Sequence, residues 1–113
     1  LEMDAAYPIT EEDLQLLHRT WDLSVYSEDG IVQAPRVKTL RFGPDGRYEM
    51  ITENETSRGN WTARLFAIES TLILDDDSGE TLTFTIVDLE EALLNLRSWR
   101  ENVQIEEQFS PAD

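Results

Sequence analysis

Apolar and polar residues alternate along most of this chain, and the alternation begins near Thr20. A period of two is typical of strands that bury one face. In the first run, Trp21, Leu23 and Val25 are expected to share the inner face. Eight such runs are predicted to be strands, over residues 21–26, 36–42, 47–52, 57–65, 70–75, 81–87, 92–99 and 103–109.

Short turn sequences separate these runs. Residues 42–46 read Phe-Gly-Pro-Asp-Gly, in which proline presets the first corner and the last glycine supplies a positive φ where the turn needs one. Residues 76–79 and 100–102 are predicted to be turns between the fifth and sixth runs and between the last two. The pattern therefore predicts a series of hairpins.

Eight successive antiparallel strands would expose two apolar edges unless the sheet closes on itself. We therefore predict a mainly β fold, an eight-stranded antiparallel up-and-down barrel with a short N-terminal helix. A two-sheet sandwich is the alternative, because the sequence does not show whether the first and last strands pair. With 113 residues the chain has room for one core, so residues 1–113 are predicted to be a single domain.

A helix is predicted over about residues 10–19. Thr10 can accept hydrogen bonds from free backbone amides, and the three acidic residues after it favour the positive end of the helix dipole. Leu14, Leu17 and His18 then fall on one face. We expect this face to pack on the barrel as a lid.

Charge and composition narrow the classes of function. The chain has 9 basic and 24 acidic residues, which gives a formal net charge of -15. Such a surface repels phosphate backbones and anionic lipid, so nucleic acid is not expected as a partner. Cysteine is absent, which excludes disulfides and thiolate metal sites. No stretch approaches the roughly 20 apolar residues of a membrane helix, so no transmembrane segment is predicted.

Several segments occur in a recognisable order, namely residues 16–23, the Leu-x-Phe-x-x-Asp-Gly-x-Tyr hairpin of 40–48, Gly59-Asn60-Trp61, 79–84 and 88–96. Together they resemble the small bacterial lipocalin-like domains over residues 14–109. The resemblance implies an eight-stranded barrel in an exported or lipid-anchored envelope protein, with no shared catalytic residues. The expected location is the periplasm or the envelope if an upstream signal was removed, and otherwise the cytoplasm.

Five aromatic residues are predicted to face the barrel interior: Trp21, Phe42, Tyr48, Trp61 and Phe84. The interior of an eight-stranded barrel is just wide enough for side chains to fill. Two interpretations therefore stay open. The aromatic residues form a plain packed core, or they line a small apolar ligand pocket open at one end.

Other candidate chemistry is sparse. His18 is the only histidine, so no imidazole pair is present for zinc or copper. Residues 75–80 are rich in aspartate but lack the spacing of an EF-hand, and they are predicted to form a solvated hairpin turn. Glu107 shares the face of Ile105 and Phe109, and we expect it at the barrel rim rather than buried. No catalytic residue, metal site or cofactor is predicted.

These observations predict a noncatalytic lipocalin-like binding domain of the bacterial cell envelope, which holds a small apolar molecule at the barrel mouth. The alternative is an acidic interaction or scaffold module that binds a basic protein through its outer surface. For that role, Arg58, Asn60, Thr62 and Arg64 are predicted to stand on an outward face.

Overall fold

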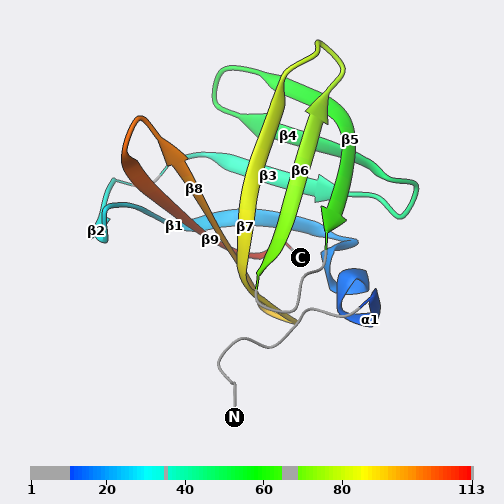
Figure 1. Ribbon diagram of the computed structural model, residues 1–113, viewed down its shortest axis with the longest axis horizontal. Coiled ribbons are helices and arrows are strands. Elements are labelled where there is room, and N and C mark those ends of the chain that lie inside the picture. Colours follow the sequence, from blue (N-terminus) through cyan, green and yellow to red (C-terminus); the bar gives the residue numbers. More distant parts are fainter. Residues whose placement is uncertain (1–10, 35, 65–68, 113) are drawn as a thin grey trace.

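The computed structural model describes residues 11–34, 36–64 and 69–112. Within these residues a short helix precedes nine strands of one antiparallel sheet (Figure 1). The elements are α1 (Glu11–Leu14), a 3-10 turn η1 (Gln15–Leu17), β1 (Thr20–Glu28), β2 (Ile31–Val32), β3 (Lys38–Phe42), β4 (Arg47–Thr52), β5 (Thr56–Arg64), β6 (Ser70–Asp76), β7 (Thr81–Glu90), β8 (Leu93–Arg100) and β9 (Val103–Pro111).

Pairing between the first and last long strands closes the sheet. β1 pairs with β9 from Trp21 opposite Pro111 to Glu28 opposite Ile105. The remaining long strands follow in chain order from β3 to β9, and closure removes the edges that an open sheet would expose. The predicted eight-stranded up-and-down barrel is confirmed in preference to the sandwich. The two-residue β2 is an addition that the sequence pattern did not predict.

A β-bulge changes which residues of β1 face inward. Two residues, Ser24 and Val25, separate the inward-facing Leu23 and Tyr26, where strict alternation allows one. Tyr26 is consequently buried. The expectation that Val25 shares the inner face with Trp21 is therefore wrong.

The helix is shorter than the sequence predicts. α1 and η1 together end at Leu17, and the proposed cap Thr10 lies outside the described residues. Leu17 is completely buried in the core and Leu14 packs against it, so α1 and η1 cover one end of the barrel (Figure 1). His18 is exposed and meets the ring of Trp61 edge-on at 5.6 Å. Among the described residues, no helix has the length and apolar character needed to span a bilayer.

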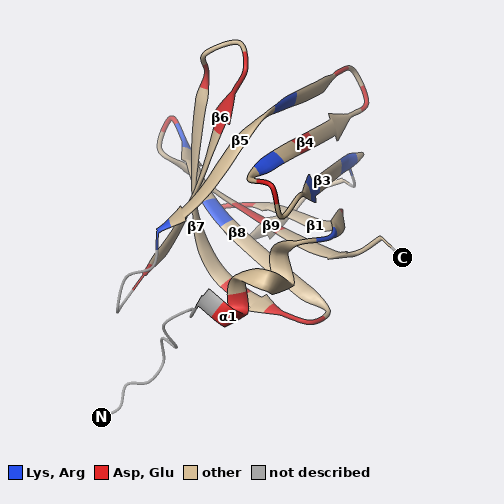
Figure 2. Ribbon diagram, turned by 90° about the vertical axis from the view of Figure 1, so that its right-hand side faces the viewer, with Lys and Arg blue, Asp and Glu red and all other residues tan. Residues whose placement is uncertain are grey.

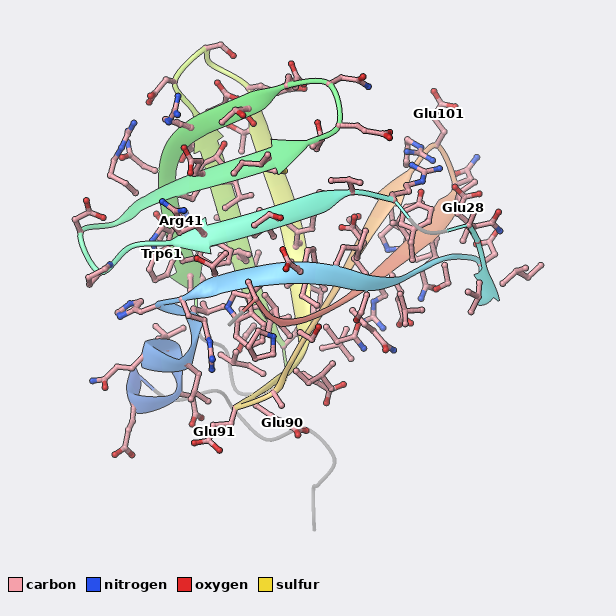
Figure 3. The ribbon with its side chains drawn as sticks, turned by 180° about the vertical axis from the view of Figure 1, so that it is seen from behind. Glu28, Arg41, Trp61, Glu90, Glu91 and Glu101 are labelled. Atoms are coloured by element: carbon pink, nitrogen blue, oxygen red, sulfur yellow. The ribbon has the colours of Figure 1, made fainter. Side chains whose placement is uncertain are left out.

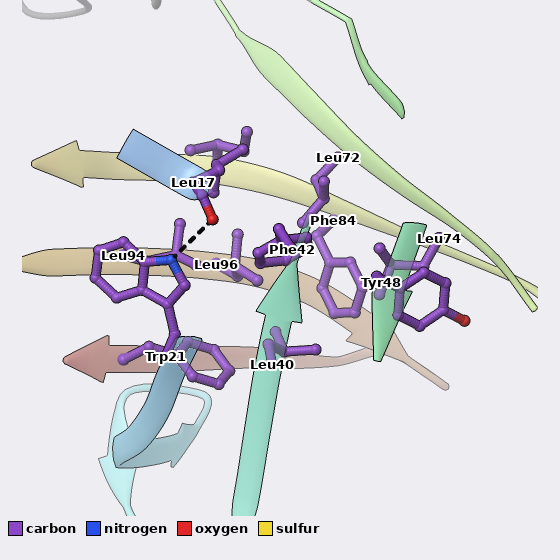
Figure 4. Packing of buried hydrophobic residues seen from close by; sticks show 12 residues of the cluster. Leu17, Trp21, Leu40, Phe42, Tyr48, Leu72, Leu74, Phe84, Leu94 and Leu96 are labelled. Atoms are coloured by element: carbon purple, nitrogen blue, oxygen red, sulfur yellow. Dashed lines mark hydrogen bonds between the residues drawn. The ribbon is translucent and has the colours of Figure 1, made fainter. Parts of the chain in front are cut away.

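One apolar cluster fills the barrel beneath this helix (Figure 4). At the end of the cluster next to η1, the indole nitrogen of Trp21 donates a hydrogen bond to the backbone oxygen of Leu17, at 3.4 Å. The buried members are Leu17, Trp21, Leu40, Phe42, Tyr48, Leu72, Leu74, Phe84, Ile86, Leu94, Leu96 and Phe109. They come from every long strand except β5, whose Trp61 packs against the cluster as a partly buried residue.

Candidate binding site at the barrel mouth

The end of the barrel away from α1 carries a cavity, and we call this end the mouth. It comprises the last residues of β1, the strand β2, the start of β3 and the connections β4–β5 and β8–β9. Pairing between β1 and β3 is confined to residues Thr20–Asp22 on β1, and β2 takes over at Ser27 and Glu28. A cavity of about 350 Å³ lies where the strands separate. Its lining is Leu23, Arg36, Val37, Lys38, Thr52, Glu53, Asn54 and Glu107.

An ion pair with a buried carboxylate lies in this cavity. The Lys38 ammonium lies 2.8 Å from Oε2 of Glu107, and the two side chains are 20% and 6% exposed. Lys38 opens the inward row of β3 that continues with Leu40, and Glu107 stands on β9 between two buried apolar residues. A charge is buried at tolerable free energy only when it is paired and hydrogen-bonded, and here each group satisfies the other. The prediction that Glu107 is an unburied rim residue is wrong.

A second charged cluster adjoins the first. The Tyr26 hydroxyl donates to Oε2 of Glu28 at 2.8 Å, and the Arg100 guanidinium donates to the same Glu28 oxygen at 3.3 Å. Arg36 stacks over the Tyr26 ring, with its guanidinium carbon 4.1 Å from the ring centre. The hydrogen bond to Tyr26, with the nearby Glu28 carboxylate, raises the pKa of Arg100 above its usual value.

These two clusters form one lining. Tyr26 and Glu107 are directly opposite each other on β1 and β9 and therefore share the inner face. Arg36 belongs to both the cavity wall and the Tyr26 cluster. Leu23 and Val37 add apolar surface beside these charges. The cavity can therefore contact both an apolar group and a charged group of one molecule.

The five aromatic residues predicted to line a pocket belong to the core below the mouth. Trp21, Phe42, Tyr48 and Phe84 are between 0% and 7% exposed and pack in one cluster. Trp61 is partly buried, and its indole nitrogen donates to the Gly43 oxygen at 3.0 Å. None of the five is among the described residues that line the mouth cavity. Their predicted contact with a ligand stays a prediction.

The outer face of β3, β4 and β5 carries a ladder of ion pairs. Glu49 lies between Arg41 and Arg58, at 3.6 Å and 2.8 Å. Arg47 pairs with Asp77 at 2.7 Å. This hydrogen bond lowers the pKa of the Asp77 carboxyl and raises that of Arg47. The basic residues of this face are thus largely neutralised by neighbouring acids.

Acidic residues are spread over the molecule. Figure 2 shows them in α1, in turns and on several strands. In Figure 3, Glu28 and Glu101 lie near β2 at the mouth, whereas Glu90 and Glu91 lie at the end that carries α1. The outward row from Arg58 to Arg64 is confirmed, since its four polar side chains are exposed. This distribution does not single out one face for a basic protein partner.

The aspartate-rich segment 75–80 forms the hairpin turn between β6 and β7, as predicted. Asp76 serves the turn itself by accepting a hydrogen bond from the Ser78 amide at 2.6 Å, whereas Asp77 pairs with Arg47 of β4. Within the part of the chain that is described, no three His, Cys, Asp or Glu side chains are grouped as a metal site would require.

The ion pair of the mouth was not predicted, although two features of the sequence indicate it. Lys38 is the only lysine of the chain, and it falls two residues before the inward Leu40. Glu107 interrupts the inward apolar row that contains Ile105 and Phe109. A basic and an acidic residue at inward positions are expected to pair, because neither is stable alone in a barrel interior.

Comparison with protein families, with characterised proteins and with solved structures gave no significant match.

Proposed function

We propose that this protein is a noncatalytic binding barrel that holds a small amphiphilic molecule in the mouth cavity. The observation that carries the proposal is the cavity itself, whose volume is about 350 Å³. Ligand pockets occupy roughly 300 to 1,000 Å³ and combine apolar walls with a few placed polar groups. Leu23 and Val37 provide such walls, and Lys38 and Glu107 provide the polar groups.

The packed core limits the size of the ligand. Phe42 and Leu40 are almost completely buried where β3 continues inward from Lys38. An apolar tail long enough to reach Trp21 would have to displace these side chains, and displacing close-packed residues is unfavourable. The bound molecule therefore stays near Leu23, with its apolar part no larger than the mouth accepts.

The closed eight-stranded barrel is compatible with a lipocalin-like fold. The resemblance of residues 14–109 to the small bacterial lipocalin-like domains supports membership of that family, and with it a place in the cell envelope. The coding sequence upstream of Leu1 tests this part of the proposal. A signal sequence with a lipobox cysteine supports an envelope location, and a cytoplasmic open reading frame without one contradicts it.

A neutral fluorescent probe tests ligand binding without regard to charge. Prodan, whose emission rises and shifts to the blue in apolar surroundings, is titrated into the wild-type protein and two variants. Val37→Trp fills the mouth from a residue that is 58% exposed, so the fold tolerates the larger side chain. Val87→Trp is the matched control, because Val87 lies on the outer face at a bulge of β7 and is 37% exposed.

The expected result is saturable binding to the wild type and to Val87→Trp, and loss of binding in Val37→Trp. Amide shifts in the NMR spectrum are expected to gather at Leu23, Lys38, Thr52 and Glu107. No saturable response in the wild type, or equal responses in the two variants, would overturn the proposal.

A further inference from the structure

The charged and polar groups of the mouth form two sets: acceptor groups that two paired strands hold in place, and cations on flexible side chains. The acceptor groups are Glu107 on β9 together with Tyr26 and Glu28 on β1, the two strands whose pairing closes the barrel. The mobile cations are Lys38, the first residue of β3, and Arg36, two positions before it. Each cation contacts one acceptor group: Lys38 pairs with the Glu107 carboxylate, and Arg36 lies over the face of the Tyr26 ring.

The two sides differ in their freedom to move. Glu107 is 4% exposed and sits in the middle of a strand paired on both sides, so its carboxylate cannot follow a departing partner into water. Lys38 carries its charge on a flexible four-carbon chain that can extend to solvent. The Arg36 side chain is already 54% exposed. The mouth can therefore exchange its cation, whereas its anion stays in place.

This asymmetry decides which ligand charge the mouth accepts. A ligand anion that took Lys38 would leave the buried Glu107 carboxylate without a partner, which is strongly unfavourable. A ligand cation that took Glu107 would release Lys38 toward water and toward Glu53, which also lines the cavity. Only the second exchange leaves every charge satisfied.

The charge of the whole molecule acts in the same direction. The net charge of -15 gives the protein a negative field that attracts cations and repels anions. Exposed acids stand in the connections of the mouth, among them Asp29, Glu55 and Glu101. Figure 3 shows Glu28 and Glu101 at this end of the barrel.

We infer that the mouth binds an organic cation, an ammonium or guanidinium group joined to a small apolar part, and that Glu107 is its counter-ion. In the free protein the Lys38 side chain occupies the place of this cation. The inference rests on the proposed function and adds to it the chemical class of the ligand.

Three probes with the same eight-carbon chain test the inference on the wild-type protein. Octylammonium, octanol and octanoate are titrated by calorimetry at low ionic strength, below the concentrations at which they form micelles. Octylammonium is expected to bind most tightly, octanol less tightly, and octanoate least. Equal affinities, or preference for octanoate, would overturn the inference and leave the binding barrel intact. If none of the three binds and the prodan titration also fails, the proposed function itself is overturned.

Two variants give a second, independent reading. Lys38→Met removes the resident cation, so the affinity for octylammonium is expected to rise by about tenfold, because the ligand no longer competes for its site. Arg64→Met is the matched control, since it removes the same charge from the exposed outer face of β5. Equal effects of the two substitutions, or a weaker affinity for octylammonium in Lys38→Met, would contradict the inference.

Glu107→Gln keeps the shape of the side chain and removes its charge. The affinity for octylammonium is expected to fall by about 30-fold or more, as it does when one partner of a desolvated charge pair is lost. Octanol affinity is expected to change little. Equal losses for both probes would show that the substitution damages the cavity rather than a cation site. If either variant does not fold, the three-probe series on the wild type still decides.

Discussion

The two ends of the barrel are built from different chemistry. At the end covered by α1 and η1, Leu17 and Trp21 are completely buried, and apolar contact is the main interaction. At the mouth, the buried groups are the Glu107 carboxylate and the Tyr26 side chain. Their partners, the Lys38 ammonium and the Glu28 carboxylate, are partly exposed. Apolar burial stabilises a fold directly, whereas a buried ion pair gains little net free energy over apolar residues of the same shape.

If the mouth binds a ligand as proposed, the difference separates the residues that stabilise this fold from those that bind. The covered end supplies the packed interior that every long strand meets or contacts. The mouth keeps polar groups in a wall that apolar residues would stabilise at least as well, which fits the proposed role of this end in recognition. Substitutions at the two ends should therefore differ in how they change the free energy of unfolding.

Truncation at the covered end is expected to have the largest effect. Trp21→Ala removes a fully buried indole and its hydrogen bond to Leu17, and should lower the free energy of unfolding by about 3 to 5 kcal/mol. Trp61→Ala should have a smaller effect, because Trp61 is only partly buried. Urea unfolding measures both. A loss below about 1 kcal/mol for Trp21→Ala would mean that the core can collapse around the missing ring.

At the mouth, the pair should behave as a unit. Lys38→Met leaves the buried Glu107 carboxylate without its partner and should destabilise the protein by about 3 kcal/mol. Glu107→Leu should cost less, because the Lys38 ammonium it frees can extend to water. The double variant places two apolar groups in contact and should lose about 1 kcal/mol or less. A double-mutant cycle in urea gives the coupling. Additive losses would show that the two charges act independently and that the ends differ less than their composition indicates.

Tyr48, a buried residue of the core, should make the stability of the protein depend on pH in the alkaline range. Burial raises the pKa of Tyr48 above its ordinary value of 10.0, and the charges of Asp76 and Asp77 add to the shift. A folded-state pKa that is raised contributes stability that is complete below the unfolded value and is lost as pH rises through the folded value. The melting temperature should therefore fall above about pH 10.

Tyr48→Phe tests this assignment. The variant should be less sensitive than the wild type to pH across the alkaline range, because it has no phenol to ionise at this position. Melting curves recorded at intervals between about pH 8 and pH 11 measure the slope. Identical slopes for the two proteins would assign the alkaline loss to other groups.

The sequence predicted the barrel because its main determinant is local. Alternation and turn residues fix which runs are strands, and closure follows from the need to cover two edges. Phe42 of β3 and Phe84 of β7 were therefore correctly predicted to face inward. The same rule failed at Val25, because a bulge depends on the register with β9 and leaves alternation of the sequence unchanged.

The mouth was harder to predict for a physical reason. Lys38 and Glu107 are 69 positions apart in sequence, so their pairing appears only when β1 and β9 close the barrel and β3 diverges from β1. The aromatic residues indicated an inner face, but inner position alone does not distinguish a filled core from a lined cavity. That distinction depends on how side chains from opposite strands meet.

The smallest expected effect lies at the turn between β8 and β9 on the mouth. Glu101 and Asn102 both have positive φ, at 50° and 73°. Hairpin turns with two such residues favour glycine at the second position, which the turn after β1 already has in Gly30, with φ at 83°. Asn102→Gly should raise the free energy of unfolding by about 0.5 kcal/mol, and Gly30→Asn should lower it by a similar amount. Urea unfolding measures both changes. Because neither side chain lines the cavity, prodan affinity should stay constant, and a change in affinity would show that the turns help to shape the mouth.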